Sequence, residues 1–255
     1  MIFFRCGVIA IALMFSALAV MAAVESSEQQ PVVVGVAANF APVAEAVARQ
    51  FERETGTKVQ IVVGSTGLLF AQIKQGAAID VFLAADMDRP RQLARGTSVA
   101  EVYTRGRLSL WWPAAAGPVT LESFLAQAQL VALPNPRLAP YGVAAEAILA
   151  RYEPIEPRWT RILGQNVGAT FNQISAGSVD GGFVALSQLL AAGTPTSQYL
   201  VLPESSYPPI LQGAVLTAAG ESRQKAEAFL RFLLSPRVQQ RLAQWGYLPV
   251  EAAVS

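Results

Sequence analysis

Four short turns contain the residues of this chain that are best suited to chemistry, and the chemistry they offer is hydrogen-bond donation. Each turn follows an apolar segment and opens a helix, where unpaired backbone N–H groups and a partial positive charge favour an anion. Hydroxyl and amide side chains add further donors. The turns contain Asn39 with Phe40, Ser65 with Thr66, Tyr141 with Gly142, and Val167 with Gly168.

The four turns lie in uncharged surroundings. Residues 36–44, 62–73, 138–145 and 162–179 contain no Lys, Arg, Asp or Glu, and Arg137 lies one residue before the third segment. Such a site can hold a small, desolvated anion through oriented dipoles, but it has no group for acid–base chemistry. Four unrelated loops that are neutral by coincidence would give the same pattern.

The residue types present argue against an enzyme. The chain has no histidine, and its one cysteine, Cys6, lies in the N-terminal segment that we expect to be removed. The mature protein would therefore lack a thiol nucleophile, the Ser-His triad and the commonest metal ligand. Ser65 with Lys74 is a conceivable nucleophilic pair, but no motif supports it.

The charged residues give little sign of a metal or nucleic-acid partner. The formal net charge is +1, whereas nucleic-acid-binding domains carry a strong positive excess. Asp80, Asp86 and Asp88 could bind a metal, but two of them fall in a predicted first helical turn, where acids are favoured for local reasons. We therefore expect neither partner.

The first 23 residues are typical of a secretory signal. Arg5 supplies the positive start, residues 8–15 form an apolar core, and small residues at 17–19 or 21–23 offer two alternative cleavage sites. A retained membrane anchor is the other interpretation, because the apolar run approaches spanning length. Residues 24–31 form a polar linker.

Predicted strands and helices alternate along the rest of the chain, which indicates parallel sheets covered by helices. We expect an α/β protein of two lobes, each a mainly parallel sheet flanked by helices, with the ligand in the cleft between the lobes. Residues 32–108 and 213–255 would form the first lobe and residues 109–212 the second. The main predicted helices are 42–54, 66–74, 121–127, 141–151, 168–175, 187–192, 221–235 and 236–245.

Six segments match one family pattern, in order, over almost the whole mature chain. They are residues 37–40, 64–67 with 71–73, 76–86, 135–142, 166–168 and 182–186. In these segments the sequence resembles the periplasmic molybdate-binding proteins of ABC transporters. The resemblance implies a type II periplasmic binding fold and a tetrahedral oxyanion, molybdate or tungstate, held without charged side chains.

The resemblance also implies the site. The best-studied branch of the family has a ligand tyrosine where this chain has Ala185, and Tyr141 is the candidate to replace it. Molybdenum would be bound only as the oxyanion, through Asn39, Thr66, Tyr141 and Val167, with no further cofactor. The implied ligand-binding residues are Ala38, Asn39, Ser65, Thr66, Tyr141 and Val167.

The implied function is capture of the oxyanion in the periplasm, as a monomer and without catalysis, for delivery to an inner-membrane ABC permease. A binding protein for another small anion, such as sulfate or phosphate, is the main alternative. Organic carboxylates usually require an arginine clamp, which these turns lack. A secreted transferase of similar fold is a further alternative. A regulator's effector domain is disfavoured by the secretory signal and by the absence of a DNA-binding segment.

Overall fold

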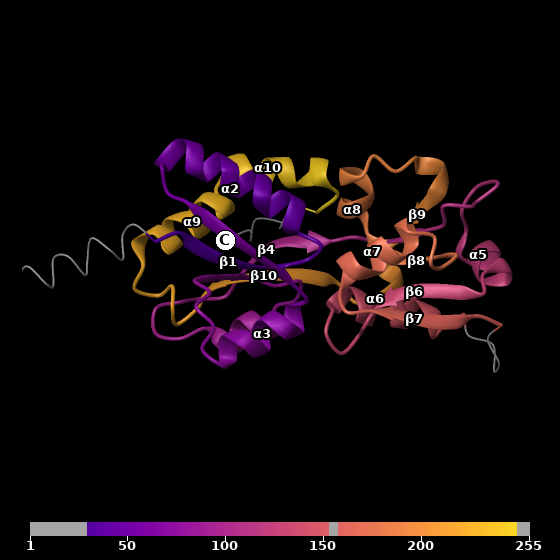
Figure 1. The fold of residues 1–255 in the computed structure, drawn as a ribbon, viewed down its shortest axis with the longest axis horizontal. Helices are drawn as coiled ribbons and strands as arrows, with labels where there is room; N and C mark the ends of the chain where they lie inside the picture. The colour runs from indigo at the N-terminus through magenta and orange to yellow at the C-terminus, as the bar shows by residue number, and fades with distance from the viewer. Residues whose placement is uncertain (1–29, 153–157, 249–255) are drawn as a thin grey trace, which may run out of the picture. The chain divides into compact units, whose positions relative to one another are not determined.

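The computed structural model describes residues 30–152 and 158–248, in which the strands form two sheets of five (Figure 1). The predicted signal, residues 1–23, and all but the last two residues of the predicted linker lie outside the described residues. The cleavage site and the anchor alternative therefore stay predictions. Within the described residues, no helix has both the length and the apolar character needed to cross a membrane.

The first sheet has the strand order β2-β1-β3-β10-β4. Its central strand β1 (Val32–Ala37) pairs in parallel with β2 (Val59–Gly64) and β3 (Val81–Leu83). The strand β10 (Ile210–Leu216) pairs antiparallel with both β3 and β4 (Glu101–Gly106). Five of the six residues of β1 are buried, because neighbouring strands flank it and helices cover both faces of the sheet.

Helices cover the two faces of the first sheet (Figure 1). On one face pack α2 (Ala41–Thr55), α9 (Gln224–Leu234) and α10 (Pro236–Leu242). On the other pack α3 (Thr66–Lys74) and α4 (Asp88–Leu93).

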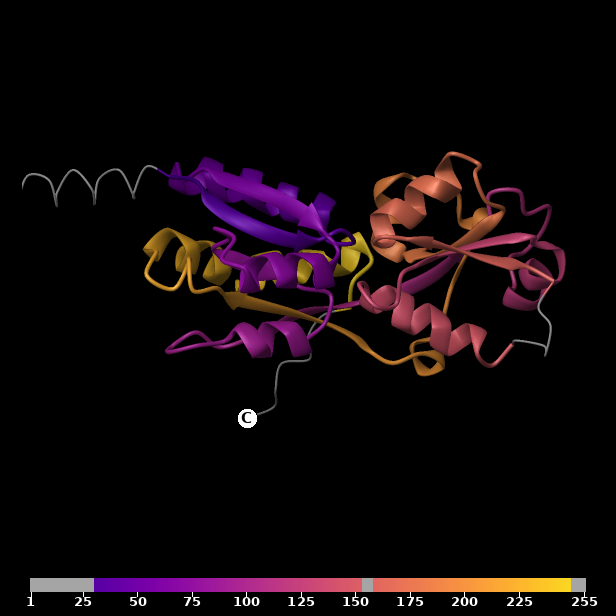
Figure 2. The same ribbon diagram turned by 60° about the horizontal axis from the view of Figure 1, so that its bottom comes forward.

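The second sheet has the strand order β7-β6-β8-β5-β9. One face packs against α5 (Leu121–Gln127) and α6 (Pro140–Leu149), and the other against α7 (Val167–Ser175) and α8 (Leu186–Ala191). Figure 2 shows this second layered unit as a separate body of strands and helices. Its strands are β5 (Leu108–Trp111), β6 (Leu130–Pro134), β7 (Thr160–Gly164), β8 (Gly181–Ala185) and β9 (Tyr199–Val201).

The sheets are mixed, which differs from the expectation of mainly parallel sheets. Each sheet has two parallel and two antiparallel strand pairings. The antiparallel pairings all involve β10 or β5, the strands next to the connections between the lobes. The chain passes from β4 to β5 through the single residue Arg107 and returns after β9 through residues 202–209. The exact lobe boundaries remain a prediction.

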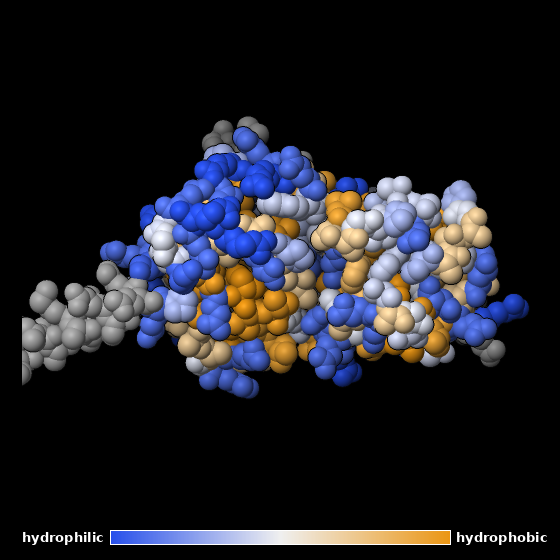
Figure 3. Space-filling view, turned by 45° about the horizontal axis from the view of Figure 1, so that its top comes forward, coloured by the Kyte–Doolittle hydropathy of each residue, from blue (hydrophilic) through white to orange (hydrophobic). Residues whose placement is uncertain are grey.

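The surface is polar with scattered apolar residues. Figure 3 shows hydrophobic areas on both lobes, set among hydrophilic residues. Four of the exposed large hydrophobic residues are Val63 and Leu68 in the first lobe and Val143 and Leu163 in the second, each 47–50% exposed. Val63, Leu68 and Val143 each lie within two residues of one of the four turns, and Leu163 lies next to Gly164 at the end of β7.

Candidate functional site

The four uncharged turns follow the carboxyl ends of parallel strands, two in each lobe. In the first lobe Ala37 pairs with Gly64, and the N–H of Ala38 donates to the Gly64 carbonyl at 3.0 Å. In the second lobe Pro134 pairs with Gly164, and the N–H of Asn135 donates to the Gly164 carbonyl at 2.7 Å. The same local arrangement therefore occurs twice, once on each side of the cleft.

A small cavity lies where the turns meet. Its volume is about 10 Å³, which is roughly the room that one water molecule needs. None of the described residues that line it carries a formal charge. All six predicted ligand-binding residues line it: Ala38, Asn39, Ser65, Thr66, Tyr141 and Val167, together with Ala37, Gly64, Ala85, Ala139, Pro140 and Asn166.

Thr66 presents its hydroxyl as a donor. The side chain is 1% exposed, and its Oγ1 accepts the N–H of Ala85 at 3.0 Å. The hydroxyl hydrogen has no acceptor among the described residues, so it is available to a ligand. Ser65 resembles it, because its Oγ caps α3 by accepting the N–H of Leu68 at 3.2 Å. Both hydroxyls are thus oriented by backbone donors.

The side-chain amide nitrogen of Asn39 is already paired and cannot donate to a ligand. Its Nδ2 donates to Gln212 Oε1 at 3.0 Å and to the Tyr247 hydroxyl at 3.3 Å, which uses both amide hydrogens. Its carbonyl accepts from the Ser187 hydroxyl at 3.0 Å and from Tyr247 at 2.7 Å. Any hydrogen that Asn39 donates to a ligand would therefore come from its backbone N–H. Its Oδ1 is buried without a donor among the described residues.

Tyr141 enters the site from the second lobe. It is 1% exposed, and its hydroxyl oxygen accepts Nε2 of Gln212 at 3.4 Å. Burial, followed by the neighbouring phenols of Tyr247 and Tyr103, raises the pKa of Tyr141 well above its ordinary value. The hydroxyl therefore keeps its hydrogen at neutral pH and can only donate it to a ligand, since no described residue accepts it.

Val167 opens α7 beside a side-chain cap. Asn166 Oδ1 accepts the N–H of Ala169 at 2.8 Å, and Nε2 of Gln188 donates to the Val167 carbonyl at 3.2 Å. The Gln188 Oε1 also accepts the N–H of Ala185. Ala185 is fully buried and does not line the cavity. Tyr141, rather than the strand position at 185, brings the phenol to the site.

Backbone N–H groups complete the donor set. Thr66 and Val167 are the first residues of their helices, and Tyr141 follows Pro140, which itself has no N–H. First-turn N–H groups have no partner inside the helix. None of these three N–H groups, nor that of Asn39, reaches an acceptor in the described parts of the chain. Three helix starts and one strand end therefore bring unpaired backbone donors to residues that line one small cavity.

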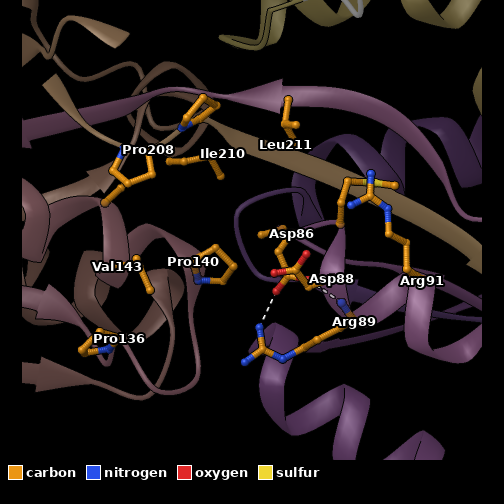
Figure 4. Close-up of a pocket in the computed structure, with 14 residues that line it drawn as sticks. Asp86, Asp88, Arg89, Arg91, Pro136, Pro140, Val143, Pro208, Ile210 and Leu211 are labelled. Atoms are coloured by element: carbon orange, nitrogen blue, oxygen red, sulfur yellow. Dashed lines mark hydrogen bonds and ion pairs between the residues drawn. The ribbon is translucent and has the colours of Figure 1, made fainter. Parts of the chain in front are cut away.

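A second, larger hollow of about 330 Å³ lies next to the site and shares Ala85 and Pro140 with it. Figure 4 shows the ion pair of Asp86 and Arg89 on one side of this hollow, with Pro136 and Val143 on the other. Its size suits an organic ligand. Arg89 is already paired with a carboxylate, and Arg91 also lines the hollow. This hollow is therefore wider than the small cavity and, unlike it, is lined by charged residues.

The alternative chemistries considered from the sequence find no geometric support. Ser65 and Lys74 lie at opposite ends of α3, roughly 13 Å apart, and Lys74 is exposed. Asp80 pairs with Arg223 and accepts the N–H of Val33 at 2.8 Å, a structural role. Among the described residues, no group of three acidic, cysteine or histidine side chains could hold a metal.

Sequence reasoning missed three residues of the site. Ala85 supplies the N–H that orients Thr66, and Asn166 caps α7. The preference of asparagine for helix N-caps could have identified Asn166. Gln212 contacts both Asn39 and Tyr141 from a strand far along the chain, and no local signal marks it.

Comparison with known proteins agrees with this architecture. Residues 32–248 match the family of bacterial extracellular solute-binding proteins. The chain is 32% identical over 228 residues to a molybdate-binding protein of Rhodobacter capsulatus (85% of this chain, 88% of the relative). It is 33% identical over 231 residues to one from Azotobacter vinelandii (87% and 91%). A solved structure of the Azotobacter vinelandii periplasmic molybdate-binding protein superposes with a TM-score of 0.78 at 31% identity, covering 86% of this chain and all of that one. The chain therefore belongs to the bacterial extracellular solute-binding protein family.

Proposed function

We propose that this protein captures a tetrahedral oxyanion, molybdate and also tungstate, in the periplasm and delivers it as a monomer to the inner-membrane permease of an ABC importer. The observation that carries the proposal is the small cavity lined by donors without a formal charge. The names of the relatives from Rhodobacter capsulatus and Azotobacter vinelandii supply the identity of the anion. Membership of a solute-binding family argues against the transferase alternative.

The proposed ligand-binding residues act through donors of two kinds. Backbone N–H groups of Asn39, Thr66, Tyr141 and Val167 contribute the dipoles of the helix starts. Hydroxyls of Thr66, Tyr141 and Ser65 add short, oriented hydrogen bonds. Ala38 shapes the wall between the lobes, where its Cβ lies 3.3 Å from the position of a Cβ on Gly168. A fully deprotonated anion can accept from all of these donors at once.

Neutral donors suit an anion that must be released again. An arginine clamp would hold the anion by charge as well as by geometry, whereas hydrogen bonds from N–H and O–H groups disappear when the lobes separate. The permease would then receive the anion from an opened cleft. The exposed apolar residues beside the turns, Val63, Leu68, Val143 and Leu163, support a partner that contacts both lobes at once.

Phosphate is a second candidate, favoured by one observation. The buried Oδ1 of Asn39 has no donor among the described residues, and it could accept the O–H of a protonated anion. Molybdate and sulfate, which are fully deprotonated at neutral pH, have no hydrogen to give it. The donors around the cavity outnumber this single acceptor, so molybdate remains the preferred ligand.

A thermal-shift screen of the purified mature protein tests the proposal. The anions would be molybdate, tungstate, sulfate, phosphate and chromate, because a ligand that binds only the native state raises the melting temperature. We expect large shifts with molybdate and tungstate and little or none with sulfate. A larger shift with sulfate or phosphate than with molybdate would overturn the assignment.

A further inference from the structure

Gln212 is a buried amide on β10, the strand by which the chain returns to the first lobe. It is fully buried, and an amide at such a position costs free energy unless its polar atoms are paired. Its Oε1 accepts from the Tyr103 hydroxyl at 2.8 Å and from Asn39 Nδ2 at 3.0 Å. Its Nε2 donates to the Tyr141 hydroxyl at 3.4 Å.

The direction of these hydrogen bonds matters for the ligand. Oε1 is a pure acceptor and is occupied by two donors of the first lobe, so the amide is held with Nε2 facing Tyr141. The phenol oxygen of Tyr141 accepts that N–H. Its own hydrogen must then point elsewhere, and no described residue accepts it. Gln212 thus leaves Tyr141 as a donor with a free hydrogen beside the cavity.

A second feature of the sequence makes room for this contact. Gly106 is the last residue of β4, and a Cβ there would lie 2.2 Å from the Tyr141 hydroxyl and 2.7 Å from Gln212 Nε2. Real Cβ atoms do not approach other atoms so closely, so a larger residue would displace the pair. The absence of a side chain at Gly106 therefore leaves space for the Tyr141 hydroxyl to contact the Gln212 amide.

We propose that Gln212 is a positioning residue of the anion site, which orients the Tyr141 hydroxyl as a donor and ties it to Asn39 across the two lobes. The proposal rests on the proposed oxyanion function. Asn39 and Tyr103 belong to the first sheet and its turns, whereas Tyr141 belongs to α6 of the second lobe. The amide therefore links the donors of one lobe to the donor of the other.

A double-mutant cycle tests this role, because coupling is what a merely structural residue would not show. The four proteins are the wild type, Gln212→Met, Tyr141→Phe and the double variant, each titrated with molybdate by calorimetry. We expect each single substitution to weaken binding at least about tenfold. We expect the double variant to bind within about threefold of Tyr141→Phe, because Gln212 has little left to orient once the hydroxyl is gone.

Gln50→Met is the matched control. Gln50 is also a largely buried amide, but it lies on α2 and bonds to Glu54, away from the cavity. We expect its affinity for molybdate to equal that of the wild type.

If Gln212→Met does not fold, Gln212→Glu replaces it, since a carboxyl still accepts from Tyr103 and Asn39 but cannot donate to Tyr141 when ionised. Its affinity should fall as the pH rises and the carboxyl ionises, while that of the wild type stays level.

The outcomes separate the two claims. A wild type that does not bind molybdate would overturn the proposed function itself. A wild type that binds, with Gln212→Met or Gln212→Glu binding equally well, would overturn the inference alone. Losses that simply multiply in the double variant would also contradict it, because they would show that Gln212 acts independently of Tyr141.

Discussion

The backbone N–H of Gly67 in the first lobe donates to the carbonyl oxygen of Leu138 in the second, over 2.9 Å. Gly67 directly follows Thr66, so this bond joins the lobes beside the proposed hydroxyl ligand. A Cβ on residue 67 would lie 3.2 Å from both the Cα and the carbonyl oxygen of Leu138. The glycine thus allows the two backbones to approach when the cleft is closed.

Gly67→Ala should therefore weaken binding without harming the fold. The added methyl crowds Leu138 only in the closed form, while alanine favours the helix by up to about 1 kcal/mol. We expect an unchanged or higher melting temperature without ligand and roughly fivefold weaker molybdate binding, about 1 kcal/mol. Gly117→Ala is the control, since a Cβ there meets no atom within 4 Å. Wild-type affinity in Gly67→Ala would show that closure does not need this contact.

Thr66→Val should weaken binding because it removes a buried donor at nearly constant size. A lost hydrogen bond to an anion should cost roughly 1–3 kcal/mol, and the N–H of Ala85 also loses its acceptor, which lowers stability. Calorimetric titration with molybdate measures the first effect and a melting curve the second. Thr120→Val is the control, because it removes a helix cap at an exposed position far from the cavity. Unchanged affinity in Thr66→Val would mean that backbone N–H groups alone hold the anion on this side.

Much of the site could be predicted from sequence because it is local. A strand, a neutral turn and a helix start are contiguous, so the four turns could be located from the sequence, and the family resemblance then implied Asn39, Thr66, Tyr141 and Val167 as ligands. Val43, Val47 and Phe51 recur at four-residue spacing, a pattern typical of the buried face of a helix, and all three are buried on α2. Gly56 caps the end of that helix in the left-handed region, a place where glycine is common.

Features that depend on distant parts of the chain could not be read in this way. Gln212 lies 173 residues from Asn39, so the sequence near either residue does not predict the hydrogen bond between them. The strand β4 was not predicted, although Val102, Tyr103 and Thr104 favour strands. Strand direction in a sheet also depends on where the chain comes from. The crossing strands enter from the other lobe and make the sheets mixed.

Affinity should depend only weakly on ionic strength. The cavity has no formal charge among its described lining residues, and screening acts mainly on exposed charges beyond a Debye length of about 8 Å. Arg137 is exposed. Its backbone N–H donates to Asn135 Oδ1, and its carbonyl oxygen accepts a long hydrogen bond from Arg89 at 3.5 Å. Molybdate titrations from low to high sodium chloride, with Arg137→Gln alongside, measure this. A steep salt dependence that Arg137→Gln abolishes would reveal a counter-ion.

Affinity should also stay level with pH up to the ordinary tyrosine pKa of about 10. Burial, as the main cause, raises the pKa values of Tyr103 and Tyr141 well above that value, so both phenols keep their hydrogens. The folded protein therefore favours the neutral form of both tyrosines. Their contribution to the free energy of unfolding is fully present below the tyrosine pKa of the unfolded chain, and it is lost as the pH rises through the higher pKa of the folded protein. Titrations across the neutral and mildly alkaline range test this. A marked loss of affinity below the ordinary tyrosine pKa would show that another group controls binding.

The most direct test of the account is a crystal structure of the mature protein with molybdate, with the molybdenum located by its anomalous scattering. The account predicts one strong peak in the small neutral cavity, within hydrogen-bonding reach, through its oxygens, of Asn39, Thr66, Tyr141 and Val167. A peak in the larger hollow beside Arg89 and Arg91, with the small cavity empty of molybdenum, would contradict it.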